Sequence, residues 1–406
     1  WDLSICKHVI AIGGKYSMQF DKIHNRIGTN SDKWDSLQSL YGLSPNEAIP
    51  MWVADMDFEA PEAVTNCIRE MAEQGIYGYA REDDTYRQAI VCWMQRRHQW
   101  QIQPDSVLSV HGIVNAIALA IQAYTQPGDG IIIFSPVYHA FSRVIKASQR
   151  SLVESPLVKD SIGKYKMDLD ATANLLTGNE KMLILCSPHN PGGRVWSVQE
   201  LEQVAEFAER HNLLIVSDEI HHDLVYDGYI HTPFEKAVPS ARPYLMTLTS
   251  TTKTFNIAGM HTGNVIISDE KRREKFKKTL QALAISPSSF GVAMTSAAYN
   301  GGDEWLDQLL IYLAQNYELF NRRIHQIDGL ISMPLESTYL CWVDYRSLNM
   351  SLSQYKQKIE SQSKVAASYG DAFGAGGEGH LRFNIAMPRQ LLDSALDRVQ
   401  AAFECV

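Results

Sequence analysis

Three polar residues in the middle of the chain follow strand-like apolar runs, and together they could do covalent chemistry on an amino group. Asn190 comes after KMLILCSPH, Asp218 ends LLIVSD, and Lys253 follows YLMTLTSTT. The carboxyl ends of parallel strands meet at one crevice, so side chains that are distant in sequence can converge there. A lysine can form a Schiff base, a carboxylate can pair with a pyridinium nitrogen, and an amide can bond a ring hydroxyl. The set therefore suggests pyridoxal phosphate chemistry.

Taken singly, each of these residues also has a structural interpretation. Asp218 fits a turn or a helix N-cap, Asn190 with Pro191 and Gly192 is an ordinary turn signal, and Lys253 fits a surface lysine. Their joint order, each behind an apolar run, favours the functional interpretation. Lys253 also stands among threonines and a serine without an acidic neighbour. No adjacent carboxylate would then hold its ammonium in the protonated form.

The elements expected around these residues form an α/β fold. Apolar runs of strand length are SVLSVHG, GIIIFSP, KMLILCSP, LLIVSDEI, YLMTLTS and GNVIISD, and helix-period patterns cover 60–75, 84–100 and 197–212. Continuous apolar strands that alternate with helices predict a mainly parallel sheet covered on both faces.

After about residue 300 the pattern changes to a long helix over 304–327, strands in STYLCWVDYR and HLRFNIAM, and a C-terminal helix. We therefore expect a large cofactor-binding α/β domain over 67–299. Residues 19–66 and 300–406 would form a smaller α+β domain, and residues 1–18 would be an extension or N-terminal arm.

Composition limits the partners. The 406 residues carry a net charge of −9, which argues against nucleic acid or an anionic membrane as the main partner. The basic run KRREKFKK at 271–278 includes an acid and reads as a solvated helix face. Six scattered cysteines without a CxxC motif favour reduced thiols and a cytoplasmic location. No apolar run approaches the ~20 residues that span a bilayer.

Two motifs suggest other ligands, and we expect neither to bind them. His221 and His222 are adjacent to acidic residues, but neighbours on a strand point to opposite faces, so no metal is expected. The run GAGGEG at 374–379 lacks a preceding strand and precedes a strand, so it predicts a loop and not a dinucleotide site.

The order and wording of the motifs closely resemble fold-type-I, pyridoxal-phosphate-dependent enzymes of the aminotransferase class I/II group, in particular the MalY/PatB-like cystathionine β-lyase (C–S lyase) branch. The resemblance begins at about residue 19 and rests on RIGTNSDKWD, MWVADMDFEAP, GIYGYARED, SPVYHAF, SPHNPGGRVWS, SDEIHHDLVY, TSTTKTFNIAG, STYLCWVDYR and LRFNIAMP. It implies the fold of the pyridoxal-phosphate-dependent transferases, with a mainly parallel seven-stranded sheet in the large domain.

The resemblance also implies roles for individual residues. Lys253 would be the Schiff-base lysine and the proton shuttle at Cα, and Asp218 would keep the pyridine nitrogen protonated. Asn190 would bond the ring hydroxyl and contact substrate, and Tyr138 would stack on the ring as part of the catalytic set. Arg382 would grip the substrate carboxylate with its two-pronged guanidinium. A salt bridge for Arg382 and a core position for Tyr138 are the structural alternatives.

The cofactor phosphate would be bound by hydroxyls and backbone N–H groups. Candidates are Ser250 and Thr252 before the lysine, and Ile113 and Val114 where a loop enters a helix. Tyr79 resembles a tyrosine that reaches the phosphate of the neighbouring subunit. This implies a homodimer with active sites at the subunit interface.

Two positions depart from the pattern of many relatives. His221 stands where many aminotransferases place a cofactor-binding tyrosine, which favours a lyase, and His261 replaces a phosphate-binding arginine. At the substrate entrance, Tyr339 is a candidate contact and Asp55 a weaker one.

The sequence thus predicts a pyridoxal-phosphate-dependent carbon–sulfur β-lyase. It would cleave cystathionine, cysteine or S-substituted cysteines, small amino-acid thioethers, to pyruvate, ammonia and a thiol. The alternatives are an amino-acid aminotransferase and, from another class, a regulatory protein on the same fold.

Overall fold

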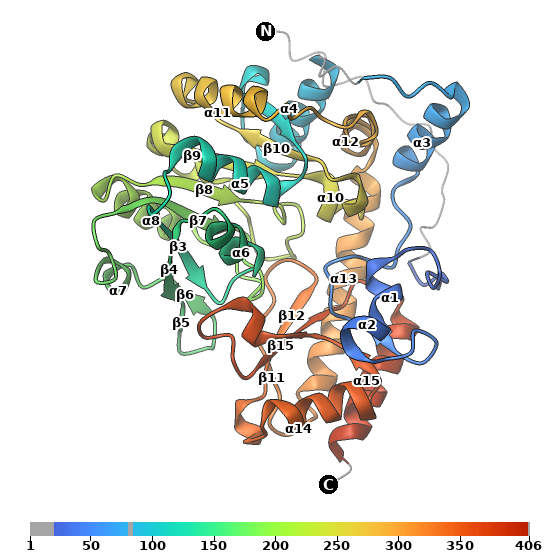
Figure 1. The fold of residues 1–406 in the computed structure, drawn as a ribbon. Helices are drawn as coiled ribbons and strands as arrows, with labels where there is room; N and C mark the ends of the chain where they lie inside the picture. The colour runs from blue at the N-terminus through green and yellow to red at the C-terminus, as the bar shows by residue number, and fades with distance from the viewer. Residues whose placement is uncertain (1–19, 80–83, 405–406) are drawn as a thin grey trace.

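The computed structural model describes residues 20–79 and 84–404, shown as the coloured ribbon in Figure 1. The expected extension or arm at residues 1–18 lies outside the described residues. The division of the chain at 66/67 and 299/300 stays a prediction.

A seven-stranded sheet forms the centre of the upper part of the molecule, with strand order β2-β10-β9-β8-β7-β3-β4 (Figure 1). Its strands are β2 (Val107–Val110), β3 (Gly130–Ser135), β4 (Ser151–Pro156), β7 (Glu180–Cys186), β8 (Leu214–Asp218), β9 (Leu245–Thr249) and β10 (Gly263–Ile266). Strand β10 pairs antiparallel with both β2 and β9, and the other pairs are parallel. The predicted mainly parallel α/β sheet is confirmed.

Successive side chains on a strand point to opposite sides of the sheet, and in these strands both sets are apolar, so both faces of the sheet are apolar. Ile131 and Ile133 of β3 pack in one buried cluster with α5 (Ile113–Tyr124) and α6 (Ala140–Ala147). Ile132 and Phe134 pack in another cluster with α8 (Val198–Arg210). The strands therefore read as unbroken apolar runs, as expected for a sheet covered on both sides.

The helices of the described residues, in chain order, have the following bounds. They are α1 (Asp32–Asp35), α2 (Leu37–Tyr41), α3 (Glu62–Gln74), α4 (Asp84–His98), α5 (Ile113–Tyr124), α6 (Ala140–Ala147), α7 (Leu169–Ala173), α8 (Val198–Arg210), α9 (Phe234–Ala237), α10 (Thr251–Thr254), α11 (Glu270–Ala282), α12 (Ser289–Gly301), α13 (Asp303–Ile324), α14 (Leu352–Lys356) and α15 (Arg389–Glu404).

A second, antiparallel sheet of four strands lies beside α13 and α15 in the lower part of Figure 1, in the order β11-β12-β15-β14. Its strands are β11 (Ile331–Ser332), β12 (Leu340–Asp344), β15 (His380–Asn384) and β14 (Ser368–Tyr369). Two short pairs complete the strands, β1 (Ile49–Pro50) with β13 (Val365–Ala366) and β5 (Val158–Lys159) with β6 (Tyr165–Lys166). The strands and the long helix predicted after residue 300 are thus present.

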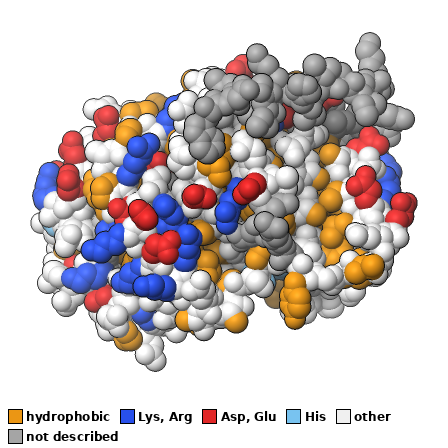
Figure 2. Space-filling model, turned by 90° about the horizontal axis from the view of Figure 1, so that it is seen from above, with side chains coloured by type: hydrophobic (Ala, Val, Ile, Leu, Met, Phe, Trp, Pro, Cys, Tyr) orange, Lys and Arg blue, Asp and Glu red, His pale blue; other side chains and the backbone are white. Residues whose placement is uncertain are grey.

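The remaining sequence expectations about elements are also met. The basic run at 271–278 lies in α11, where Phe276 is the buried residue. Figure 2 shows Lys and Arg side chains interspersed with Asp and Glu on the face seen from above. Residues 374–379 form a loop that leads into β15. No helix within 20–79 and 84–404 is long and apolar enough to cross a membrane.

A buried ion network fixes the loop between β1 and α3, which borders the site described below. The carboxylate of Asp57 accepts hydrogen bonds from Lys33 Nζ at 2.7 Å, Arg26 Nη1 at 2.8 Å and Trp34 Nε1 at 2.9 Å. Lys33 is 0% exposed and Asp57 4%. Burial alone would raise the pKa of Asp57, but Lys33 and Arg26 hold this pKa below its usual value.

We expect Asp57→Ala to lower the free energy of unfolding by about 3–5 kcal/mol, because the substitution leaves the Lys33 ammonium buried without its carboxylate. The matched control is Glu59→Ala, which removes an ion pair to Lys22 between side chains that are 68% and 52% exposed. This control should change stability by less than about 1 kcal/mol. Urea unfolding of the two variants measures the difference, and equal effects would contradict the assigned role of the buried pair.

Candidate active site

The ends of β7, β8 and β9 bring the three predicted residues together. Asn190, Asp218 and Lys253 line one cavity of about 490 Å³, which we call the inner cavity. Six other predicted site residues line it too: Ile113, Val114, Tyr138, His221, Thr252 and Arg382. The convergence expected from parallel strand ends is present.

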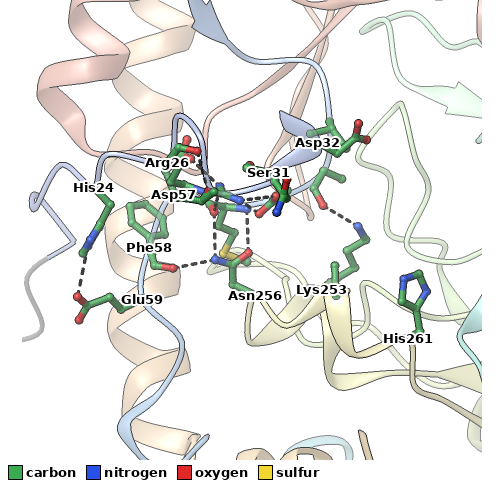
Figure 3. A pocket seen from close by; sticks show the side chains of 18 residues that line it. His24, Arg26, Ser31, Asp32, Asp57, Phe58, Glu59, Lys253, Asn256 and His261 are labelled. Atoms are coloured by element: carbon green, nitrogen blue, oxygen red, sulfur yellow. Dashed lines mark hydrogen bonds and ion pairs between the residues drawn. The ribbon is translucent and has the colours of Figure 1, made fainter. Parts of the chain in front are cut away.

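Lys253 lies on α10, the short helix that follows β9. Ser250 caps this helix by accepting a hydrogen bond from the N–H of Thr252, and the Lys253 ammonium then donates to the carbonyl oxygen of Ala54 at 2.6 Å. Figure 3 shows Lys253 reaching from the α10 segment toward that loop. Burial lowers the pKa of Lys253 to about 8, so much of the amine is neutral in mildly alkaline solution.

Asp218 is the last residue of β8 and is 4% exposed. Its Oδ1 accepts a hydrogen bond from the N–H of Ile220 at 3.1 Å, and among the described residues no Lys, Arg or His forms an ion pair with it. Burial raises the pKa of Asp218 to about 7. A cationic group in the inner cavity would stabilise its ionised form.

Arg382 on β15 orients Asn190. Its Nη1 donates to Asn190 Oδ1 at 3.0 Å, which leaves the amide nitrogen of Asn190 free to donate. Nη2 donates to the carbonyl of Trp52 at 2.7 Å and to Ser368 Oγ at 3.2 Å. The remaining nitrogen, Nε, is buried and has no hydrogen-bond partner in the described structure. Among the described residues its hydrogen-bond acceptors are neutral oxygens, and its guanidinium carbon lies 4.9 Å from the centroid of the Phe373 ring.

Burial without a carboxylate partner has an electrostatic consequence for this guanidinium. It lowers the pKa of Arg382 to about 10, although the group stays protonated at neutral pH. The structural alternative for Arg382, a salt bridge, is not what the described residues form. An anionic ligand would supply the missing counter-charge.

The N-terminus of α5 opens into the inner cavity. Gly112 precedes it with φ of 89°, a conformation that disfavours side chains, and caps the helix without a side-chain hydrogen bond. The N–H groups of Ile113 and Val114 belong to the first turn, where helical N–H groups have no intrahelical partner. These N–H groups are donors suited to an anion. The Thr252 hydroxyl also lines the cavity, but it donates to Ser250 Oγ at 2.8 Å, because the Ser250 hydrogen goes to the Thr262 carbonyl.

The two predicted ring contacts also line the inner cavity. Tyr138 lies just before α6, with its ring centroid 4.9 Å from that of His139. Burial lowers the pKa of His221 to about 3, so this imidazole is neutral, and its Nδ1 has no hydrogen-bond partner among the described residues. His221 can therefore accept or donate one hydrogen bond to a ligand but supplies no charge.

Three predicted residues do not line the inner cavity. Ser250 Oγ donates to the carbonyl of Thr262 at 2.6 Å, so its hydrogen is engaged inside the protein. Tyr339 is buried behind His221, with ring centroids 6.4 Å apart. Tyr79 is fully exposed, and its predicted contact with a neighbouring subunit stays a prediction.

A second, outer cavity of about 780 Å³ adjoins the first, and Lys253 and His261 border both. Figure 3 shows its lining, with His24 and Glu59 at one side and His261 at the other. The weaker candidate Asp55 lies in this lining, where Arg26 Nη2 donates to its Oδ2 at 2.8 Å. His261 adopts φ of 46° after the short turn that follows Lys253, and its imidazole reaches the border between the cavities.

Sequence reasoning missed several contributors. The Ala54 carbonyl accepts a hydrogen bond from Lys253, and the Trp52 carbonyl accepts one from Arg382. Every residue has a backbone carbonyl, so the residue type does not indicate such a contact. Ser368 and Asn115 also line the inner cavity. Asn115 could have been found, because it occupies the first turn of the same predicted helix as Ile113.

Comparisons with known proteins agree with this geometry. A family model described as "Aminotransferase class I and II" matches residues 49–399. Cystathionine beta-lyase PatB of Bacillus subtilis (strain 168) is 37% identical over 388 residues, covering 95% of this chain and 100% of that protein.

Two solved structures superimpose closely. The PLP-bound putative aminotransferase from Clostridium difficile 630 has a TM-score of 0.92 at 36% identity and covers 95% of this chain and 100% of its own. Cystalysin from Treponema denticola, which contains a pyridoxal 5′-phosphate cofactor, has a TM-score of 0.91 at 32% identity, with 95% and 99% covered.

We expect the apoprotein of Lys253→Met to be more stable than wild-type apoprotein near pH 7, by on the order of 2 kcal/mol, since the wild type buries an ammonium there. The pKa of Lys253 is lowered from 10.5 to about 8. Between these values the unfolded chain binds more protons than the native one, so wild-type stability rises with pH and the advantage of the variant shrinks.

Urea unfolding of both apoproteins at about pH 7 and about pH 9.5 measures this change, because groups common to both proteins cancel in the difference. Lys277→Met is the control, as Lys277 is a half-exposed lysine of α11. A stability difference that is independent of pH would contradict the lowered pKa.

Proposed function

Because the chain belongs to the aminotransferase class I and II family, we propose that it is a pyridoxal-phosphate-dependent carbon–sulfur β-lyase. The observation that carries the proposal is the set in the inner cavity, where Lys253 faces the same space as Asp218, Asn190 and Arg382. The reaction type follows the end-to-end likeness to PatB, which is named a cystathionine beta-lyase.

The donors and acceptors of the inner cavity fit pyridoxal phosphate. Asp218 is a buried carboxylate that has no cationic partner among the described residues, which suits a protonated ring nitrogen. The first turn of α5 offers N–H donors to a phosphate, and Thr252 would add a hydroxyl donor on release of its bond to Ser250 Oγ. His221 Nδ1 is buried and without a partner, and the free amide N–H of Asn190 can donate to a ring hydroxyl.

When bound, pyridoxal phosphate supplies an aldehyde that reacts with amines and a conjugated ring that accepts electron density from the substrate Cα. Lys253 provides the amine that holds the cofactor, and its Nζ then removes the proton from Cα. Its lowered pKa leaves a neutral base available near neutral pH. Asp218 would hold the ring nitrogen protonated, and Tyr138 would provide an aromatic contact for the ring.

Arg382 orients the substrate. Within residues 20–79 and 84–404 the buried guanidinium has no partner for Nε and no carboxylate beside it, so the α-carboxylate of an amino acid is the ligand that completes it. Loss of the Cα proton and cleavage of the Cβ–S bond release a thiol, and hydrolysis of the remaining three-carbon fragment yields pyruvate and ammonia.

The finer assignments rest on the same proposal. The substrates are cystathionine, cysteine or S-substituted cysteines, and the enzyme is a cytoplasmic homodimer in which Tyr79 reaches the site of the neighbouring subunit. The full exposure of Tyr79 in one chain supports the last point. An aminotransferase is the second candidate, since the superimposed Clostridium difficile protein is described as a putative aminotransferase.

We expect the yellow holoenzyme to release pyruvate and thiol from L-cystathionine or S-methyl-cysteine without any keto acid. The measurement couples pyruvate to lactate dehydrogenase and follows the thiol with a chromogenic disulfide. Turnover that appears only after a keto acid is added would identify an aminotransferase instead.

The control for this assay is Lys253→Ala, which should lose both turnover and the visible absorption of lysine-bound cofactor. Lys277→Ala, a change on α11, should retain both. Visible absorption that persists unchanged in Lys253→Ala would overturn the assignment of the lysine and with it the proposed chemistry.

Arg382→Lys should lower kcat/KM about 10- to 100-fold, mainly through KM, because an ammonium cannot make the paired hydrogen bonds of a guanidinium to a carboxylate. Steady-state kinetics measure the loss, and the visible spectrum reports whether the cofactor is retained. Arg398→Lys, at a partly exposed arginine of α15 outside both cavities, is the matched control. Unchanged kcat/KM in Arg382→Lys would remove Arg382 from substrate binding.

A further inference from the structure

A second cluster of titratable side chains lies on the side of β8 away from the inner cavity. His98 ends α4, and His222 and Asp223 lie in the turn after β8. One ligand atom of each residue lies within 4.8 Å of the other two. The side chains are 7%, 1% and 1% exposed. The cluster has no part in the chemistry proposed above.

The hydrogen bonds of His222 determine which of its ring nitrogens carries the hydrogen and which is unprotonated. Its Nδ1 lies 2.7 Å from the carbonyl oxygen of Glu219, and a carbonyl only accepts, so Nδ1 carries the hydrogen. Nε2 of the neutral ring is then a lone pair, and it is buried without a hydrogen-bond partner in the described structure. This lone pair faces Asp223 Oδ2 at 3.2 Å. Two electron-rich atoms at this distance require a proton or a metal cation between them.

The surroundings match those of a metal ligand. A histidine that binds a metal usually donates its other ring N–H to a carbonyl or carboxylate, as His222 does to Glu219. Asp223 is oriented by Trp93 Nε1, which donates to Oδ1 at 3.0 Å, and by Thr254 Oγ1, which donates to Oδ2 at 2.8 Å. Hydrogen-bonded carboxylates of this kind are typical of metal sites.

The charges nearby also favour a divalent cation. Asp223 and Glu219 are both buried, and among the described residues no Lys or Arg forms an ion pair with either. Glu219 is occupied by Ser217 Oγ, His231 and the N–H of Phe234, so Asp223 is the carboxylate that faces the cluster. A divalent ion would balance the two carboxylates, and a buried charge is stable when it is paired or coordinates a metal.

We propose that His98 Nε2, His222 Nε2 and the Asp223 carboxylate form a structural site for a zinc-class divalent cation. Two imidazoles and one carboxylate are ligands that zinc prefers, whereas magnesium prefers oxygen alone. Zinc bonds of about 2.0–2.1 Å place tetrahedral ligand atoms about 3.3 Å apart. In the structure His98 Nε2 is hydrogen-bonded to Asp223 Oδ1 at 2.7 Å, and His222 Nε2 lies 3.2 Å from the other oxygen, Oδ2. All three ligand atoms lie within 4.8 Å of one another, so zinc would replace the proton between His98 and Asp223 and draw the ligands into one tetrahedron.

The site would revise the expectation that this region binds no metal. That expectation considered His221 with His222, whereas His221 lines the inner cavity and His222 pairs with the distant His98. The ion would join the end of α4 to the turn after β8 and, through Thr254, to the helix that carries Lys253. It would stabilise the fold and would not contact substrate.

The test uses the wild-type holoenzyme, dialysed against a chelator and then against buffered Zn²⁺, with metal measured by mass spectrometry after gel filtration. We expect about one zinc ion per chain and an increase in Tm, because binding to the native state alone stabilises it. Mg²⁺ in the same protocol should produce neither effect. A wild-type protein that takes up no zinc would overturn the proposal without bearing on the lyase activity.

Variants localise the ion. His222→Ala should weaken zinc binding at least about 100-fold, and so should the milder change His98→Gln. Mutation of residues that only hydrogen-bond to metal ligands already lowers metal affinity about 10–100-fold. They should also abolish the zinc-dependent increase in Tm. His325→Ala, at an exposed histidine that follows α13, is the matched control and should bind zinc as the wild type does. Equal zinc binding by His222→Ala and wild type would overturn the proposal.

Cobalt binding provides a second test, which uses the wild type and His98→Gln and so does not require His222→Ala to fold. Co²⁺ bound to the wild-type holoenzyme in tetrahedral N/O coordination should produce visible ligand-field bands, and added Zn²⁺ should displace them. His98→Gln should reduce these bands while the cofactor absorption persists. Bands that persist unchanged in folded His98→Gln would place the metal elsewhere and contradict the assignment.

Discussion

The site depends on a buried amine whose hydrogen-bond partner is a carbonyl and not a carboxylate. The Ala54 carbonyl accepts from Lys253 at 2.6 Å and adds no formal charge, so burial is free to lower the pKa of the amine. A carboxylate lies one residue further on, but Arg26 forms two hydrogen bonds to Asp55, at 2.8 and 3.3 Å. The ion network of Arg26, Lys33 and Asp57 therefore keeps the loop in place and keeps its acidic groups engaged.

Asp218 and Arg382 meet the complementary requirement. Each is a buried ionisable group that no opposite charge contacts in the described part of the chain. Burial raises the pKa of Asp218 to about 7 and lowers that of Arg382 to about 10. In isolation both groups destabilise the fold. A ligand with a protonated ring nitrogen and an amino-acid carboxylate would satisfy them together, so its binding would offset the cost that the apoprotein bears.

Much of this could be predicted from the sequence, because the strands are apolar runs and β7, β8 and β9 lead into Asn190, Asp218 and Lys253. The resemblance to aminotransferase class I/II enzymes and the fold are confirmed. Strand β4 was not predicted, since SLVESP at the sheet edge is only partly buried and lacks an apolar run. The engagement of Ser250 by the Thr262 carbonyl was equally invisible, because it depends on how the turn after α10 folds back.

The turn after β8 shows why adjacent residues can serve different sites. His221 lines the inner cavity, whereas His222 lies in the cluster with His98, which is 124 positions earlier in the chain. The sequence predicted that strand alternation separates the two histidines, but both lie in a turn. Their side chains still have different surroundings, and helix α4 supplies the neighbour of His222. Asp223 then links the cluster to Thr254, next to Lys253. The same turn thus supplies His221 to the inner cavity and His222 and Asp223 to the proposed zinc site.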